Sequence, residues 1–189
     1  MDAAGGWTKE ELALSGYFGE NGLLLCNEHP NLPHLGLAGG NWNAVVALME
    51  RGDVFYSRFY KNRVTYLSRE WYFALKVHRG RYLRIPEESL RVYDFLRSAG
   101  MGNARQIQAV CRLSKKRYDA AMLALFREML VTVLWRDETI SENWCTFLYG
   151  TSETWEQKQP ENRPQANNED AQVLLARYFG QTEVQRLLR

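Results

Sequence analysis

The chain has 189 residues and a formal net charge of +2, the balance of 24 basic and 22 acidic side chains. A hydrophobic fraction of 46%, with 13% aromatic residues and only five prolines, excludes an intrinsically disordered chain. The length is sufficient for a hydrophobic core, so a small disulfide-stabilised scaffold is excluded as well. A charge this close to zero, taken over the whole chain, does not by itself indicate a nucleic-acid partner.

The three cysteines, Cys26, Cys111 and Cys145, are far apart and odd in number. This spacing does not form a disulfide framework, so we expect a reducing, cytoplasmic environment. The first six residues lack the basic start and apolar run of a signal peptide. No stretch is apolar over the roughly 18 residues that a membrane helix needs, and we expect no membrane partner.

The first part of the chain predicts a small mixed unit. Residues 1 to 40 are glycine-rich and irregular, apart from a short strand at 23 to 25. Apolar spacing predicts a helix over 41 to 51, which ends before a glycine. A hairpin follows over 54 to 67, with a turn at Lys61 and Asn62, and then a helix over 69 to 78.

The next part predicts three helices and a second hairpin. The helices cover 86 to 98, 104 to 111 and 114 to about 129, and their buried faces are expected to include Leu90, Tyr93, Ile107 and Val110. Two β-rich runs follow, over 130 to 135 and 144 to 149, with a polar loop from 136 to 143 between them. Three helices with a tight second connection, closed by a hairpin, are typical of a winged helix-turn-helix.

We therefore expect an α+β protein with a winged helix-turn-helix core, preceded by a helix and β-hairpin segment and followed by a helical tail. The expected organisation is an N-terminal α/β segment packing on the core over 1–57, a winged-helix domain over 58–156, a polar linker over 157–168 and an amphipathic helical tail over 169–189.

The near-zero net charge hides a strong segregation along the chain. Residues 1–57 hold two basic and seven acidic side chains, a balance of −5, and residues 137–189 hold five and nine, a balance of −4. Residues 58–136 hold 17 basic and six acidic side chains, a balance of +11. A basic segment that coincides with the helix-turn-helix is the pattern expected for phosphate binding.

The sharpest local feature is the start of the third helix of this unit, at Ser114, Lys115, Lys116 and Arg117. Three cations at a helix N-terminus oppose the helix dipole, which suggests that an external anion compensates them. In a helix-turn-helix this turn approaches the major groove. The alternative is an ordinary solvated turn.

Other cations extend this predicted DNA-binding surface: Arg105 and Arg112 on the preceding helix and turn, and the connector arginines Arg79, Arg81 and Arg84. The predicted wing tip carries three carboxylates, Asp137, Glu138 and Glu142, which phosphates would repel. We therefore expect the helices, and not the wing, to contact DNA.

Two other groups of residues have alternative interpretations. Cys26, His29 and His34 could ligate zinc, although a fourth ligand is not apparent and a structured loop is the stronger interpretation. A dense aromatic group suggests either base stacking or core packing, with core packing favoured: Tyr56, Phe59, Tyr66, Trp71 and Tyr72. No nucleotide-binding or hydrolase motif is present, and we expect no cofactor.

Three runs carry a resemblance to a known family. They are VFYSRFYKNRVTYLSREW at 54 to 71, KRYDAAMLAL at 116 to 125 and TSETW at 151 to 155. Over residues 20 to 156 the chain resembles a small bacterial family named AlkZ-related, which is distantly similar to winged-helix alkylpurine DNA glycosylases. Those enzymes are built from tandem winged helices and position water with a glutamine, an apolar residue, and then glutamine or aspartate.

The resemblance implies a winged-helix fold, and it draws attention to Gln106, Ile107 and Gln108. We place this triplet in the second helix of the helix-turn-helix, which does not clearly match the catalytic location in those enzymes. Our interpretation is a protein that binds double-stranded DNA without catalysis. The alternatives are a glycosylase-like repair enzyme that uses Gln106 and Gln108, and an interaction module whose tail docks a partner or a second copy of the chain.

Overall fold

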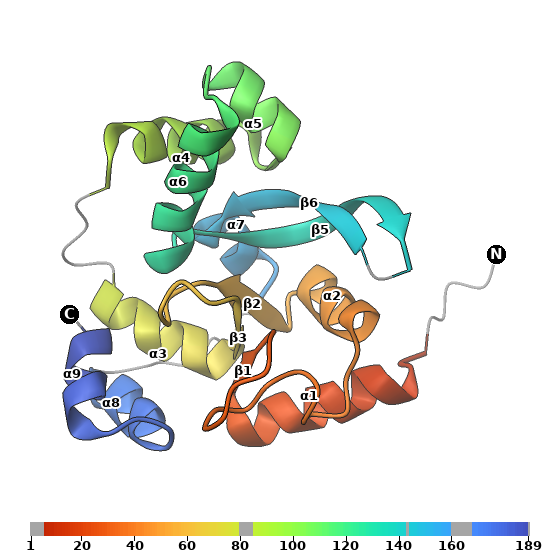
Figure 1. Ribbon diagram of the computed structural model, residues 1–189, viewed down its shortest axis with the longest axis vertical. Coiled ribbons are helices and arrows are strands. Elements are labelled where there is room, and N and C mark those ends of the chain that lie inside the picture. The colour runs from red at the N-terminus through yellow and green to blue at the C-terminus, as the bar shows by residue number, and fades with distance from the viewer. Residues whose placement is uncertain (1–5, 80–84, 143, 160–167, 189) are drawn as a thin grey trace.

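A computed structural model describes residues 6–79, 85–142, 144–159 and 168–188 of the chain (Figure 1). The described residues form a mixed α+β protein with two three-stranded antiparallel sheets. The strand orders are β1-β3-β2 in the first sheet and β4-β6-β5 in the second. No helix in these four ranges is long and apolar enough to cross a membrane.

The first sheet contains the strand and hairpin that the sequence predicts. It is built from β1 (Leu23–Leu25), β2 (Val54–Ser57) and the central β3 (Thr65–Ser68). In the hairpin turn, Lys61 and Asn62 have φ angles of 47° and 60°, and the Arg63 amide donates to the Tyr60 carbonyl at 2.9 Å. Two consecutive left-handed residues are typical of a type I′ turn, which here lies within the loop 58–64 that joins the paired Ser57 and Thr65.

Three helices cover the first sheet: α1 (Lys9–Asn21), α2 (Trp42–Arg51) and α3 (Arg69–Arg79). The prediction that residues 1 to 40 are irregular was wrong for α1. Its apolar pattern is weak, because only Leu14 and Phe18 among its hydrophobic residues are buried. A reciprocal capping box between Thr8 and Glu11 and the left-handed Gly22 nevertheless define both helix ends.

The second sheet is packed against three helices, α4 (Glu87–Ala99), α5 (Ala104–Val110) and α6 (Lys115–Arg127). Its strands are β4 (Gly102–Asn103), which lies between α4 and α5 in the chain, and β5 (Val131–Ser141) and β6 (Trp144–Thr151), which follow α6. Two burial predictions were wrong, because Leu90 is 44% and Val110 is 61% exposed. The expected loop over 136 to 143 is also shorter, since cross-strand pairing continues to Ser141.

A short helix, α7 (Ser152–Gln157), follows β6 and ends where the predicted linker begins. Residues 160–167 of that linker lie outside the described residues. The tail forms α8 (Asn168–Ala176) and α9 (Gln181–Leu187), as predicted. Most of its apolar residues are buried in the core cluster that α3 shares, whereas Val173 is 61% exposed, so a partner of the tail would have to contact its outward face.

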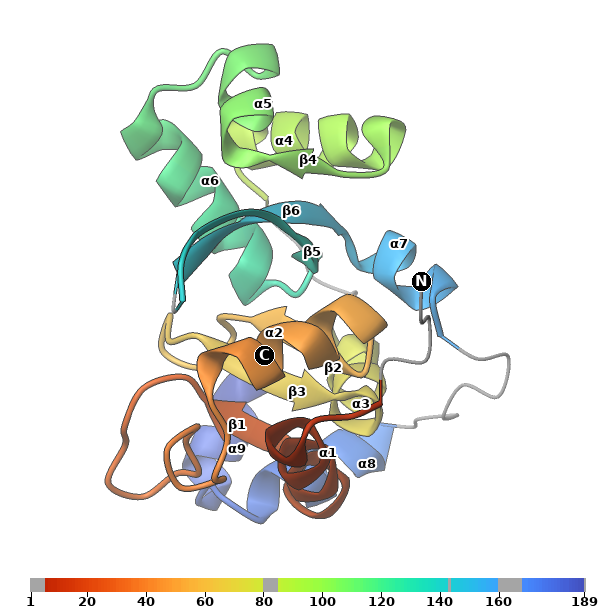
Figure 2. The ribbon, with the colours of Figure 1, turned by 90° about the vertical axis from the view of Figure 1, so that its right-hand side faces the viewer.

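The predicted domain boundary at residues 57 and 58 falls between β2 and β3, which pair with each other in the first sheet. The hairpin and α3 therefore belong with the N-terminal residues. The remaining elements, from α4 to β6, form the other half of the molecule (Figures 1 and 2).

The two halves meet where β2, an edge strand of the first sheet, faces β5, an edge strand of the second. The buried Thr132 hydroxyl accepts a hydrogen bond from the Tyr56 amide and donates one to the Tyr56 carbonyl, each at 3.0 Å. Beside it, the Trp155 ring of α7 packs edge-on against Phe55, with centroids 5.1 Å apart. A single side chain thus satisfies two backbone groups that an edge strand would otherwise leave unpaired.

Replacing Thr132 with valine should lower the free energy of unfolding by about 2 to 4 kcal/mol, because the buried amide and carbonyl of Tyr56 lose their partner. Urea unfolding followed by circular dichroism measures this change. The matched control is Thr139→Val, at an exposed position on the same strand, which should change stability by less than about 0.5 kcal/mol. Equal effects of the two substitutions would contradict the role of Thr132.

Candidate nucleic-acid interface

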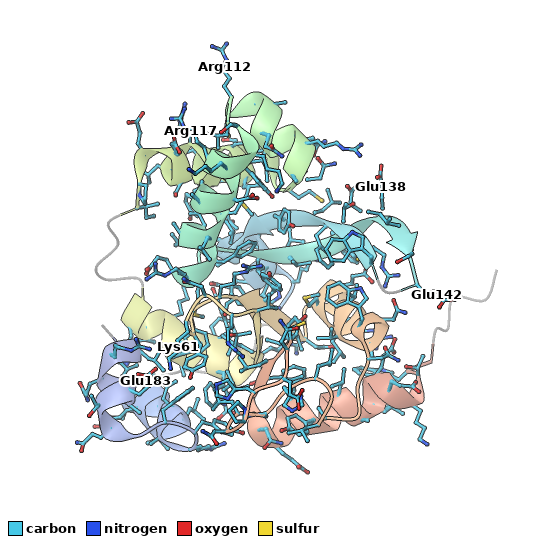
Figure 3. All side chains as sticks on the ribbon, viewed as in Figure 1. Lys61, Arg112, Arg117, Glu138, Glu142 and Glu183 are labelled. Carbon is cyan, nitrogen blue, oxygen red and sulfur yellow. The ribbon has the colours of Figure 1, made fainter. Side chains whose placement is uncertain are left out.

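The turn between α5 and α6 projects from one end of the molecule (Figures 1 and 3). It closes with the Leu113 amide donating to the Gln108 carbonyl at 2.9 Å. Arg112 in this turn has a φ of 52°, in the left-handed region that glycine usually occupies at a helix end. An arginine there costs about 1 kcal/mol relative to glycine. The exposed Arg112 side chain points away from the body of the molecule (Figure 3).

The first turn of α6 has the arrangement that the sequence predicts. Ser114 is the N-cap residue, and its hydroxyl accepts a hydrogen bond from the Arg117 amide at 3.4 Å. Lys115, Lys116 and Arg117 are all exposed. The helix contains no acidic residue in its first turn, so its positive end is not compensated from within that turn.

Intramolecular ion pairs neutralise part of this positive charge. Lys115 pairs with Asp119 one turn along α6, at 2.9 Å, and Arg117 pairs with Glu88 of α4. Arg105, Arg112 and Lys116, by contrast, form no ion pair with any described residue. Arg105 lies at the start of α5, Arg112 in the α5–α6 turn and Lys116 in the first turn of α6, and we call these three residues the free cation group.

The predicted connector arginines do not extend this group. Arg81 and Arg84 lie outside the described residues, and of Arg79 only the backbone is described, at the end of α3. In both ribbon views α3 lies on the far side of the second sheet from α5 (Figures 1 and 2). The end of α3 is thus remote from the α5–α6 turn.

The acidic hairpin tip lies away from the free cation group. Glu138 and Glu142 sit toward the far end of β5 and β6 (Figure 3). The third carboxylate, Asp137, is hydrogen-bonded within the second sheet: its Oδ2 accepts from the Asn103 side-chain amide at 3.1 Å and from the Thr146 hydroxyl at 3.2 Å. These carboxylates would repel phosphates, so an anionic polymer is favoured at the α5–α6 turn and disfavoured at the hairpin.

The glutamine side chains of the Gln106–Gln108 triplet are engaged within α5. The side-chain oxygen Oε1 of Gln106 accepts a hydrogen bond from the Asn103 backbone amide at 2.9 Å, as part of a capping box. The side-chain amide of Gln108 donates to the Ala104 backbone carbonyl at 3.1 Å. Ile107 is fully buried. The two glutamine side chains thus form hydrogen bonds within or next to α5, and the Ile107 side chain belongs to the core.

A pocket of about 350 Å³ opens between the first sheet, α2 and β6. We call it the aromatic pocket, because five aromatic side chains line it: Trp42, Tyr56, Trp144, Phe147 and Tyr149. Ala104, at the start of α5, also lines it, whereas Gln106 and Gln108 do not. The sequence did not predict this pocket, since its walls come from segments between residues 26 and 149 that only the tertiary structure brings together.

The aromatic residues singled out in the sequence are core residues, as favoured. Tyr56, Phe59, Tyr66, Trp71 and Tyr72 are all less than 10% exposed. Cys26, His29 and His34 do not gather as metal ligands. In the described ranges, no three His, Cys, Asp or Glu side chains are grouped so that they could hold a metal ion.

Several tyrosine hydroxyls are buried near the aromatic pocket. Burial raises the pKa of Tyr56 and of Tyr66, and it raises the pKa of Tyr149 to about 12, with the nearby Tyr56 adding to the increase. Burial also raises the pKa of Tyr118, which lies next to Tyr149. These groups therefore remain neutral in the folded protein at pH values where an exposed tyrosine ionises.

This burial predicts a loss of stability at alkaline pH. In the unfolded chain a tyrosine ionises near pH 10, whereas Tyr149 in the folded protein ionises only near pH 12. The stabilising difference is fully present below about pH 10 and is lost as the pH rises through this window. Absorbance at the tyrosinate band should show delayed ionisation, and Tyr149→Phe should reduce the delayed fraction. Complete ionisation near pH 10 in a folded protein would contradict the prediction.

Comparison with known proteins adds one finding. The family model described as AlkZ related matches residues 27–185, most of the chain and including the tail that the sequence resemblance leaves out. Neither a search of curated proteins nor a search of solved structures found a significant match. The match covers α2 to α8 and the first part of α9, and it includes both sheets apart from β1. The chain therefore belongs to the AlkZ-related family.

Proposed function

We propose that the unit from α4 to β6 is a winged helix-turn-helix that binds double-stranded DNA through the α5–α6 turn. The order of three helices and a hairpin, with a three-stranded sheet of order β4-β6-β5, supports this assignment. In that geometry α6 is the recognition helix, and its first turn faces the major groove. Its first-turn amides and cations would meet phosphates or guanine edges.

The observation that carries the proposal is the free cation group. Arg105, Arg112 and Lys116 are exposed and form no ion pair with a described residue. Arg112 and Lys116 flank the start of α6, and Arg105 lies at the start of α5. Arg112 also occupies a left-handed position where glycine would cost less free energy. A strained residue at an exposed tip is commonly retained for binding, and a phosphate contact accounts for both its charge and its position.

Membership of the AlkZ-related family also supports the proposal of DNA binding. It suggests a protein related to DNA repair. We limit the proposal to binding, because the Gln106 and Gln108 side chains are used inside α5 and neither lines the aromatic pocket. The acidic hairpin confines DNA to the helical end, so the predicted footprint is small and its salt dependence moderate.

Three phosphate contacts from the free cation group predict a slope of about −3 for the logarithm of the association constant against the logarithm of salt concentration. The double substitution Arg112→Gly with Lys116→Gln should weaken duplex binding and reduce the slope to about −1, because each lost contact removes about 0.9. Fluorescence anisotropy with a labelled duplex, measured over a range of salt, gives both values.

The matched control is Arg97→Gln, which removes an exposed arginine of α4 that is paired with Asp94. It should leave the slope unchanged. No measurable binding of the natural protein at about 50 mM salt, or equal slopes for the natural and doubly substituted proteins, would overturn the proposal.

Arg112→Gly alone separates folding from binding. Glycine occupies the left-handed region without strain, so the free energy of unfolding should rise by about 1 kcal/mol or stay level, since added chain entropy offsets part of the gain. Duplex affinity should fall in the same variant because one phosphate contact is lost. Thermal unfolding and anisotropy provide the two measurements. Lower stability together with unchanged affinity would show that Arg112 has only a structural role.

A further inference from the structure

We propose that the aromatic pocket binds a small planar aromatic anion, such as an aromatic carboxylate, and that Arg58 supplies the positive charge that recognises it. The proposal concerns a different surface from the α5–α6 turn and does not depend on DNA binding. The volume of the aromatic pocket, about 350 Å³, lies at the lower end of the range of about 300–1,000 Å³ that is usual for small-ligand sites. A one-ring or two-ring ligand fits this size.

The pocket walls favour a flat, apolar ligand. Trp42 and Phe147 pack against each other with ring centroids 5.8 Å apart, and Tyr149 lies next to Phe147 at 6.4 Å. Val64 and Ala104 complete an apolar lining. Trp144 forms part of the same wall, yet it is 60% exposed, which leaves its ring available to stack on a bound ligand.

Arg58 is the cation among the described lining residues, and no described carboxylate forms an ion pair with it. Its Nε donates to the Tyr56 hydroxyl at 3.2 Å, and no described residue accepts a side-chain hydrogen bond from its two terminal amino groups. A partly buried guanidinium beside aromatic walls is stabilised by an anion that accepts two parallel hydrogen bonds.

The surrounding charges agree with an anionic ligand. No aspartate or glutamate is among the described residues that line the pocket. Glu50, which lies near Cys145 in the pocket wall, accepts a hydrogen bond from the Arg136 amide at 3.0 Å and pairs with the Arg136 side chain at 3.8 Å. Its charge is thereby compensated, and Arg58 dominates the field in the pocket.

Hydroxyl groups provide further donors near Arg58. Those of Tyr56 and Tyr149 belong to lining residues, whereas the Thr146 hydroxyl already donates to Asp137. Tyr66, fully buried beside Cys26 and Tyr56, does not line the pocket.

The test uses the full chain and three probes of one shape: 2-naphthoate, the neutral 2-naphthalenemethanol and the cationic 2-naphthylmethylammonium. Isothermal titration calorimetry should show saturable binding of naphthoate. Binding of the alcohol should be about tenfold weaker, because it lacks the charge-assisted hydrogen bonds to Arg58. The ammonium probe should not bind.

Arg58→Gln should weaken naphthoate about tenfold and leave the alcohol unchanged. Its matched control is Arg63→Gln in the same hairpin, where the guanidinium donates to the Glu28 carbonyl and does not line the pocket. Trp144→Ala should weaken both probes several-fold, since each loses a stacking surface. Its control is Trp135→Ala on the neighbouring strand, whose ring lies under Lys158 outside the pocket.

Because Arg58 is partly buried, thermal unfolding of Arg58→Gln is measured first. If that variant does not fold, the exposed Trp144 variant tests the location of binding and the contrast between probes tests the charge preference. The proposal is overturned if naphthoate shows no saturable binding at millimolar concentration, if the ammonium probe binds as tightly, or if Trp144→Ala and Trp135→Ala affect naphthoate equally.

Discussion

The hydroxyl of Thr132 is the contact on which the relative placement of the two sheets depends. It pairs with both backbone groups of Tyr56 and so joins two edge strands that do not form a continuous ladder. The two halves are also joined by the Arg58 amide, which donates to the Phe126 carbonyl of α6 at 3.2 Å, and by the Glu50–Arg136 pair between α2 and β5. Trp155 fills one side of this junction against Phe55 and Tyr72, and the aromatic pocket occupies the space toward β6. The junction thus determines both the core and the cavity.

Folding also pairs cations of the basic middle segment with carboxylates from the two acidic flanks. The basic middle of the chain does not form one basic surface, because acidic side chains from the two flanks fold against it. Arg69 pairs with Asp53, Lys76 with the buried Glu156, and Arg136 with Glu50. Each pair joins a cation of the segment 58–136 to a carboxylate from outside it. In the α5–α6 unit, by contrast, the exposed cations Arg105, Arg112 and Lys116 form no ion pair with a described residue.

Most elements could be predicted because their signals are local. The spacing of Val45, Val46 and Met49 predicts α2, and the turn residues Lys61 and Asn62 predict the first hairpin. α1 was missed because two of its residues are glycines and its apolar face is narrow, although the Thr8–Glu11 capping box was present in the sequence. Val110 was misassigned because a seven-residue helix at the tip of the molecule has little core to face.

The sequence by itself determined where most helices and strands form, how Ser114 begins α6, and that the positive charge lies in the middle of the chain. These properties depend on residues within a few positions of one another, where hydrogen bonding and side-chain spacing act directly. Only the tertiary structure decided which cations stay unpaired and where the aromatic pocket opens. Both depend on contacts between residues such as Arg117 and Glu88, or Trp42 and Phe147, whose proximity no local pattern encodes.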